Sequence, residues 1–243
     1  MTHRPISDLD ERKRDQTGHG EGVRDMFDRI APTYDVANRV MSAGVDVRWR
    51  KRAVRELGEI PKGALLDSCA GTLDLTALLV AKFPERRVVA ADFSSEMLER
   101  GKNKAPAAER VQADAMKLPF ADAEFAAMIC GFGMRNLSDT KAGIREAFRV
   151  LAPGGVFVTL EFFRPIAWYS RAFHGAYANA VLPIAGGALS GDASAYRYLA
   201  RSMKGFLSRD EYEIGLREAG FSEVRGHDLL LGIASIVRAE KPT

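Results

Sequence analysis

The sequence predicts an α/β fold in which helices cover both faces of a doubly wound, mainly parallel sheet. From Pro61 onward, short apolar runs alternate with amphipathic helical segments, a pattern typical of repeated βαβ units. The runs are almost continuously apolar, as expected of strands that are buried on both faces. A chain of 243 residues, 47% hydrophobic and 28% charged, is long and apolar enough for one folded core with an additional cap.

The cap is expected before this pattern begins. Residues 1–22 are polar and contain glycines, so we expect a mobile segment there. Residues 23–60 repeat apolar side chains at helical spacing, for example Phe27 and Ile30, and therefore predict a helical cap. Residues 61–243 then form the core.

The core elements are expected in a regular order. Five apolar runs predict strands, at residues 64–67, 88–92, 110–113, 125–130 and 156–161. The helix before the fifth run is expected to end after Leu151, because a Pro-Gly-Gly sequence follows closely. A last helix begins after Ser208, and the runs 222–227 and 233–238 are close enough to pair as a terminal hairpin.

The composition argues against several classes of protein. The 35 basic and 32 acidic residues leave a net charge of +3, too small to indicate a nucleic-acid partner. Cys69 and Cys130 have no other cysteine or histidine near them in the sequence, so neither a metal site nor a disulfide framework is indicated. We expect both cysteines to be reduced packing groups.

Nothing in the sequence predicts export or a membrane span. The N-terminal residues lack the apolar core of a signal peptide. The uncharged stretch 172–191 contains His174, Pro183 and four glycines, which makes it a poor transmembrane segment. A cytoplasmic location is therefore expected.

Candidate ligand-binding residues stand where the predicted strands end, which is where ligands of open α/β sheets bind. The first run ends at Asp67 and turns through Gly71, where the backbone can pass close to a ligand. The second run ends at Asp92, the place from which a carboxylate accepts hydrogen bonds from ribose hydroxyls. Asp114 and Ala115 follow the third run and suit an adenine amino group. The alternatives are a plain turn at the glycine and helix caps at the second and third acids.

These residues favour a nucleoside with a positive centre over a dinucleotide. Leu73 stands where a G-x-G-x-x-G loop has its second glycine, and no P-loop lysine is present. Asp67 and Asp74 would repel phosphates, whereas sulfonium and ammonium groups suit an acid such as Asp67. The expected cofactor is S-adenosyl-L-methionine, without a metal.

Four stretches of the sequence are more specific to one protein family than the fold pattern is. They are Tyr34 to Asn38 with Ser42 and Trp49, Phe132 to Asn136, Arg149 to Gly155 with Glu161, and Asp192 with Tyr196 to Leu199. Together they resemble the ubiquinone/menaquinone biosynthesis C-methyltransferases, which are class I enzymes that use S-adenosylmethionine. The resemblance covers residues 23–237.

The resemblance implies a class I methyltransferase fold, Rossmann-like, with seven strands of which the last is antiparallel. It implies cofactor contacts at Thr72, Asp92, Asp114, Ala115 and Gly131. The sequence departs from the family at four positions. Leu73 replaces a glycine, Gly131 and Phe163 each replace a serine, and Asp46 replaces a histidine. A leucine at position 73 is expected to crowd the cofactor loop unless its side chain points away.

The implied reaction is methylation of a polyprenyl quinol ring, most similar to the conversion of demethylmenaquinol to menaquinol. Arg135 and Asn136 are the implied catalytic residues, facing the ring and the water that relays its proton. Tyr34, Phe132 and Tyr196 are expected on the substrate side. His174 is a further candidate there as a base, and a packed residue is the alternative reading of this histidine. Alternative substrates are 2-polyprenyl-6-methoxy-1,4-benzoquinol and another aromatic natural product. The alternative to an enzyme is a non-catalytic scaffold that binds the cofactor.

Two further expectations concern surfaces. Residues 166–196 carry only two charged side chains, Arg171 and Asp192, and predict an apolar lid over the polyprenyl tail, formed by an insertion at about 164–207. The alternative is a buried helix or a homodimer face. Residues 48–52 combine four basic side chains with Trp49, and Arg55 follows. They suit transient contact with anionic headgroups at the inner membrane face, and a solvated helix face is the alternative.

Overall fold

The computed structural model describes residues 16–166, 168, 170–171 and 193–243. A seven-stranded sheet has the order β3-β2-β1-β4-β5-β7-β6. The strands are β1 (Ala64–Ser68), β2 (Val88–Asp92), β3 (Glu109–Gln112), β4 (Phe125–Gly131), β5 (Leu151–Glu161), β6 (Ser222–Leu229) and β7 (Ala234–Glu240). Strand β7 is antiparallel to both neighbours, and the pairs among β1 to β5 are parallel. The predicted fold class and the antiparallel last strand are confirmed.

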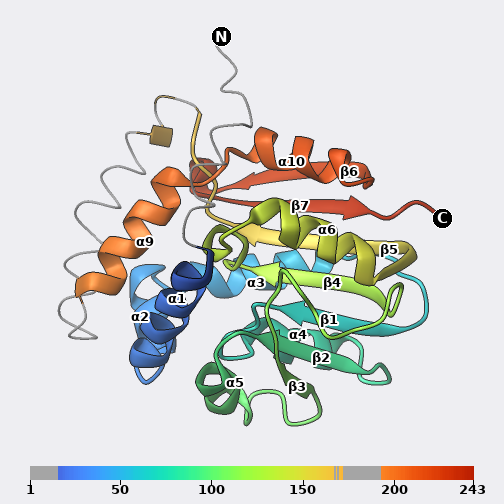
Figure 1. The fold of residues 1–243 in the computed structure, drawn as a ribbon, viewed down its shortest axis with the longest axis horizontal. Helices are drawn as coiled ribbons and strands as arrows, with labels where there is room; N and C mark the ends of the chain where they lie inside the picture. The colour runs from blue at the N-terminus through green and yellow to red at the C-terminus, as the bar shows by residue number, and fades with distance from the viewer. Residues whose placement is uncertain (1–15, 167, 169, 172–192) are drawn as a thin grey trace.

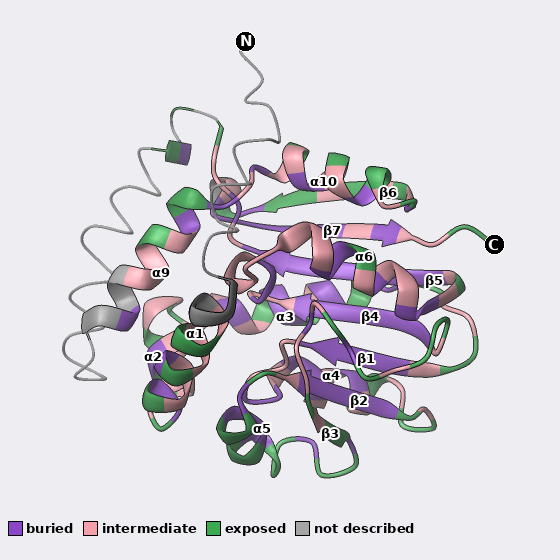
Figure 2. Ribbon diagram, in the orientation of Figure 1, coloured by how far each residue is buried: buried purple, intermediate pink, exposed green. Residues whose placement is uncertain are grey.

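Helices cover both faces of this sheet, as Figure 1 and the buried strands of Figure 2 show. The described helices are α1 (Gln16–Ile30), α2 (Tyr34–Met41), α3 (Val45–Glu56), α4 (Asp74–Lys82), α5 (Ser95–Gly101), η2 (Met134–Asn136), α6 (Thr140–Val150), α9 (Ala193–Gly205), α10 (Arg209–Glu218) and η4 (Leu230–Gly232). Helices α3, α4 and α5 share one hydrophobic cluster with the sheet, and α6 and α10 share a second. No helix among the described residues is long and apolar enough to span a membrane.

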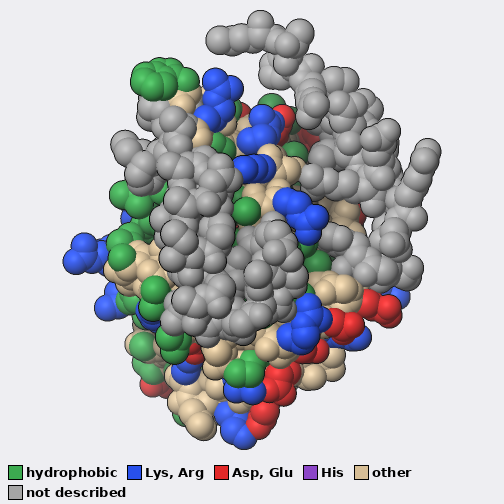
Figure 3. Space-filling view, turned by 90° about the vertical axis from the view of Figure 1, so that its left-hand side faces the viewer, with side chains coloured by type: hydrophobic (Ala, Val, Ile, Leu, Met, Phe, Trp, Pro, Cys, Tyr) green, Lys and Arg blue, Asp and Glu red, His purple; other side chains and the backbone are tan. Residues whose placement is uncertain are grey.

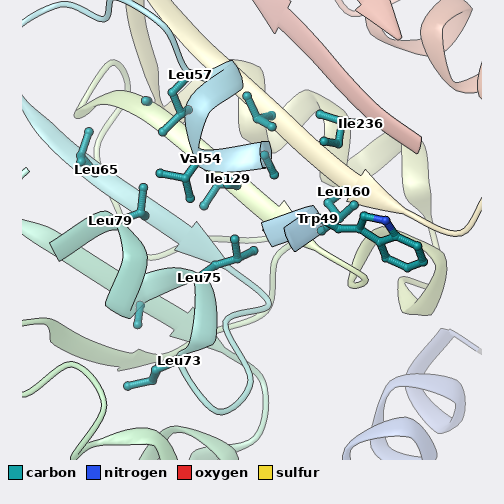
Figure 4. Close-up of a cluster of buried hydrophobic side chains, with 14 of the residues drawn as sticks. Trp49, Val54, Leu57, Leu65, Leu73, Leu75, Leu79, Ile129, Leu160 and Ile236 are labelled. Atoms are coloured by element: carbon teal, nitrogen blue, oxygen red, sulfur yellow. The ribbon is translucent and has the colours of Figure 1, made fainter. Parts of the chain in front are cut away.

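Helix α3 belongs to the core, although the sequence grouped it with the cap. Its residues Trp49 and Val54, and Leu57 directly after it, are buried in the first cluster, against Leu65 and Ile129 of the sheet (Figure 4). Helices α1, α2 and α9 instead lie together beyond the carboxyl ends of the parallel strands (Figure 1). Helices α1, α2 and α9 therefore meet the core at the strand ends, where ligands are expected.

Two element starts differ from the predictions by at least five residues. Strand β5 begins at Leu151, which was expected to end a helix, and continues through the Pro-Gly-Gly sequence. Leu151 pairs with Phe125, and Gly154 and Gly155 exchange backbone hydrogen bonds with Lys241 near the chain end. A local sequence pattern cannot predict pairing between residues this far apart in the chain. Helix α1 begins at Gln16 rather than at the predicted start of the cap, and residues 1–15 lie outside the described part.

Candidate active site

Two cavities lie side by side beyond the strand ends. The strand-end cavity, of about 280 Å³, is bordered by the turns after β1 to β4 and by α1. The cap cavity, of about 230 Å³, is bordered by α1, α2, α3, α9, η2 and the segment after β5. The residues common to both walls are Phe27, Tyr34 and Phe132.

Asp92 is anchored in the wall of the strand-end cavity. Its Oδ2 accepts a hydrogen bond from the Gly71 amide at 2.8 Å, and its Oδ1 accepts one from the Ser94 amide at 2.8 Å. Burial raises the pKa of Asp92 more than these backbone bonds lower it. Each carboxylate oxygen has lone pairs beyond the one used, so the group can accept ligand hydroxyls as well.

The strand-end cavity is also lined by other residues that were predicted to bind the cofactor. Asp114, Ala115 and Gly131 line the cavity, and the Oδ1 of Asp114 accepts a hydrogen bond from the Met116 amide at 2.8 Å. The capping alternative is wrong for Asp92, because Ser94 is the N-cap of α5. It is also wrong for Asp114, because no helix follows it directly.

Asp67 lies outside the walls of both cavities. It is fully buried, and its Oδ2 accepts a hydrogen bond from Thr76 Oγ1 at 2.6 Å. Burial raises its pKa to about 7, and the charge of Asp92 adds to the shift. The expectation that Asp67 faces the sulfonium group is therefore corrected: the side chain is buried below the turn.

Thr72 also lies outside both walls, because it joins the turn after β1 to helix α2. Its Oγ1 donates to Asp35 at 2.5 Å and accepts from Lys104 at 3.2 Å. Lys104 in turn pairs with Asp35 at 2.5 Å and with Asp74 at 2.8 Å. The Thr72 hydroxyl thus forms a polar contact between the cap and the core, and its cofactor contact stays a prediction.

Leu73 does not obstruct the cavity. It adopts a left-handed backbone with φ 66°, which is uncommon for a side chain of this size, and it is fully buried. A Cβ built on Gly101 of α5 would lie 2.6 Å from Leu73 Cγ, so the leucine packs against that glycine. Figure 4 shows Leu73 at the lower end of the core cluster. The expected crowding is absent because the side chain turns away.

Arg135 and Asn136 belong to η2 and border different cavities. Arg135 lines the cap cavity and pairs with Glu161 of β5 at 2.7 Å, while its buried Nε has no partner among the described residues. Asn136 lines the strand-end cavity, donates to the Phe132 carbonyl at 3.2 Å and accepts from the Tyr198 hydroxyl at 3.2 Å. The two predicted catalytic residues therefore stand on the two sides of the shared wall.

A buried ion cluster forms one end of the cap cavity. Asp46 accepts from Ser42 Oγ at 2.7 Å, from Arg39 at 2.5 Å and from Arg50. Burial acts to raise the pKa of Asp46, but the Ser42 hydrogen bond and the charges of Arg50 and Arg39 outweigh it and lower the pKa. Asp74 lies 3.3 Å from Arg39 and 3.9 Å from Arg50, so the two arginines face two carboxylates.

Aromatic rings form the centre of the cap cavity. Phe132 stacks on Phe162 with 4.6 Å between ring centroids, and Trp49 meets the edge of Phe162 at 6.3 Å. The Phe132 backbone has φ 59°, a left-handed conformation. Burial raises the pKa of Tyr34, so its phenol stays protonated.

The predicted substrate residues are placed only in part. Tyr34 and Phe132 form the shared wall. His174 lies outside the described residues, as does most of the predicted lid, and the side chain of Tyr196 in α9 is likewise outside them. Sequence reasoning missed Asn38 and Arg50 as cavity residues. The signal was their spacing of four from Tyr34 and Asp46, which places each pair on one helix face.

The basic stretch of α3 is not a uniform surface. Trp49 and Arg50 are buried in the cap cavity wall, whereas Arg48 and Lys51 are exposed. Contact of the tryptophan with a membrane surface is therefore excluded in this conformation. Figure 3 views the molecule from the cap side, where basic and hydrophobic side chains are interspersed. Membrane contact through the exposed basic residues stays a prediction.

Comparison with known proteins identifies the family of this chain. The profile of the ubiE/COQ5 methyltransferase family matches residues 11–241. The "Ubiquinone/menaquinone biosynthesis C-methyltransferase UbiE" of Geotalea daltonii is 40% identical, over 93% of this chain and 98% of that protein. The "Demethylmenaquinone methyltransferase" of Thermus thermophilus is 41% identical, over 89% of this chain and 100% of that protein.

Solved structures share the fold at low identity. A SAM-dependent methyltransferase of Thermotoga maritima has a TM-score of 0.66 at 18% identity, covering 90% of this chain and 99% of that one. A phosphoethanolamine N-methyltransferase of Haemonchus contortus, in complex with S-adenosylhomocysteine, has a TM-score of 0.63 at 14% identity, covering 90% and 60%. The chain is thus an S-adenosylmethionine-dependent methyltransferase that belongs to the ubiE/COQ5 methyltransferase family.

Proposed function

We propose that this protein transfers the methyl group of S-adenosylmethionine to a ring carbon of a polyprenyl quinol, converting demethylmenaquinol to menaquinol. The observation that carries the proposal is the wall of Phe27, Tyr34 and Phe132 that the two cavities share. One cavity offers carboxylates to a nucleoside, and the other offers aromatic rings to a flat apolar ring. A transfer across the shared wall needs both to be filled at once.

The strand-end cavity fits the cofactor. Asp92 would accept the ribose hydroxyls, and Asp114 and Ala115 would border the adenine, because these groups stand at adjacent strand ends. Bound there, S-adenosylmethionine supplies an electrophilic methyl group. Leu73 faces α5 and leaves this space open, so nothing in the turn favours the alternative of a non-catalytic scaffold.

The cap cavity suits the ring of the quinol. Phe132, Phe162 and Trp49 provide apolar faces, and Met26 and Met203 extend them toward α1 and α9. Such a wall excludes water, and a phenolate nucleophile facing a sulfonium reacts faster in a dry pocket because opposite charges cancel in the transition state.

Arg135 would stabilise the phenolate as it forms. Glu161 accepts from both the side chain and the amide of Arg135, which fixes the guanidinium against Phe162. A preorganised donor of this kind needs no reorganisation during the reaction. Asn136, oriented by Tyr198, would hold the water that receives the ring proton.

A direct assay tests the proposal. Purified protein, labelled cofactor and either demethylmenaquinol or 2-polyprenyl-6-methoxy-1,4-benzoquinol would be incubated, and methylated product separated by chromatography. The relative from Thermus thermophilus, 41% identical and named for demethylmenaquinone, supports the naphthoquinol as the better substrate. Faster transfer to the benzoquinol would reassign the substrate. Transfer to neither, while S-adenosylhomocysteine binds, would remove the quinol function.

A further inference from the structure

The two cysteines of the chain, distant in sequence, meet below the strand-end cavity. Cys69 follows β1 and Cys130 lies in β4, and in this parallel pair Ser68 is in register with Cys130. A Cβ built on Gly133 would lie 2.7 Å from Cys69 Sγ and 2.9 Å from Cys130 Sγ. Both sulfurs therefore border the same small space over Gly133.

The two thiols differ in access. Cys69 is half-buried and lines the strand-end cavity, whereas Cys130 is fully buried. A hydrogen bond with Cys69, together with burial, raises the pKa of the Cys130 thiol well above its ordinary value. A reagent that enters the cavity therefore meets Cys69 first.

The position of Cys69 couples it to the cofactor site. Cys69 has a left-handed backbone with φ 57° and begins the turn that contains Gly71. The next two amides of that turn bond to β2: Ala70 donates to Ala91 at 3.1 Å, and Gly71 donates to Asp92 at 2.8 Å. Since β2 and β4 lie on opposite sides of β1, a bond from Cys69 to Cys130 would draw the turn away from Asp92.

We propose that Cys69 and Cys130 form a redox-sensitive dithiol whose oxidation and cofactor binding exclude each other. With hydrogen peroxide as oxidant, the Cys69 sulfur attacks one oxygen, so an S–O bond forms, the O–O bond breaks and water leaves. The Cys130 sulfur then attacks the sulfenic sulfur; an S–S bond forms, the S–O bond breaks, and the departing hydroxide takes the Cys130 proton as water. Two thiols and one peroxide give one disulfide and two waters.

Oxidation of the wild-type protein is the first test. Full-length protein would be treated with hydrogen peroxide, remaining thiols alkylated, and peptides identified by mass spectrometry. We expect both thiols to disappear together and a peptide linked through Cys69 and Cys130 to form. S-adenosylhomocysteine at about ten times its Kd should slow this loss about tenfold, since only the free fraction reacts. An unchanged rate, or oxidation of Cys69 without the linked peptide, would overturn the proposal.

The second test asks whether oxidation weakens cofactor binding, and the affinity for S-adenosylhomocysteine is measured by calorimetry. Oxidised wild-type protein should bind it at least about tenfold more weakly, as reciprocal coupling requires, and dithiothreitol should restore the affinity. Full affinity after oxidation would contradict the exclusion.

Two variants then separate the roles of the sulfurs. In Cys130→Ala, oxidation of Cys69 should stop at a sulfenic acid that dimedone traps. In Cys69→Ala, peroxide should leave Cys130 reduced and the affinity of the variant at its untreated value. A peroxide-induced loss in Cys69→Ala equal to that of the wild type would show that another group is responsible.

Discussion

The strand-end cavity and the cap cavity share a wall, but their charged groups are partnered in different ways. The carboxylate of Asp92 is held by backbone amides and keeps lone pairs for a ligand. The charges of the cap cavity, Asp46 with Arg50 and Arg135 with Glu161, are paired with one another. The first arrangement suits a ligand with hydroxyl and cationic groups, and the second suits an uncharged ring. Charge placement, more than cavity size, separates the two sites.

The strongest test of this contrast removes the ion cluster of the cap cavity. Asp46→Ala leaves the Arg50 guanidinium, whose side chain is 9% exposed, without its nearest partner. We expect a loss of about 3–5 kcal/mol in the free energy of unfolding, as for other broken buried pairs, measured by denaturant titration. The control Glu56→Ala breaks a partly exposed pair with Arg52 on the same helix and should cost about 0–1 kcal/mol.

The same variant has a defined pH dependence. Because the folded pKa of Asp46 lies below its ordinary value of 3.8, the stabilisation is fully present above that pH. The part linked to the pKa shift is lost as the pH falls through the folded pKa, so the difference in stability between wild type and Asp46→Ala should narrow in acid. Equal losses in Asp46→Ala and Glu56→Ala would show that the cluster does not stabilise the cap cavity.

The buried carboxyl below the strand-end cavity should show the opposite dependence. Asp67 has a pKa of about 7 against an ordinary 3.8, so the folded state prefers the protonated form and loses stability as the pH rises between these values. Asp67→Asn can still accept from Thr76. It should be more stable than wild type at about pH 8 by on the order of 4 kcal/mol, and nearly equal below about pH 4. A difference that does not change with pH would disprove the assignment.

Removal of Arg135 separates chemistry from cofactor binding. Arg135→Ala should lower kcat about 100-fold, the effect of deleting one preorganised donor, and leave the Kd of S-adenosylhomocysteine within about twofold. The exposed Arg145 on α6 supplies the matched control, Arg145→Ala, which should keep wild-type turnover. Normal turnover in Arg135→Ala, or a parallel loss of cofactor affinity, would place the group elsewhere.

The smallest expected effect concerns Asp92. Asp92→Ala should weaken binding of S-adenosylhomocysteine by about 1.5–3 kcal/mol, the range for charge-assisted hydrogen bonds, measured by calorimetry. Asp210→Ala on the exposed start of α10 is the control and should bind as wild type does. If both variants bound equally well, the ribose-binding role of Asp92 would be lost.

The predictable part of the site is the part that local sequence encodes. Asp92 and Asp114 were identified because each follows a short apolar run, and strand ends of a parallel sheet share one edge. Asp67 stands at an equivalent place in the sequence. Its side chain nevertheless points into the core toward Thr76, and only the packing of α4 against β1 sets that direction.

The sequence by itself determined the order of strands and helices along the chain, the family and the positions of the two acids, Asp92 and Asp114, that line the strand-end cavity. Apolar periodicity and turn chemistry are local properties, so they survive in a single chain read from end to end. Tertiary structure alone decided that Leu73 turns toward Gly101 and that Cys69 meets Cys130. Each of these depends on contacts between elements far apart in sequence, and such contacts are fixed only when the whole core packs at once.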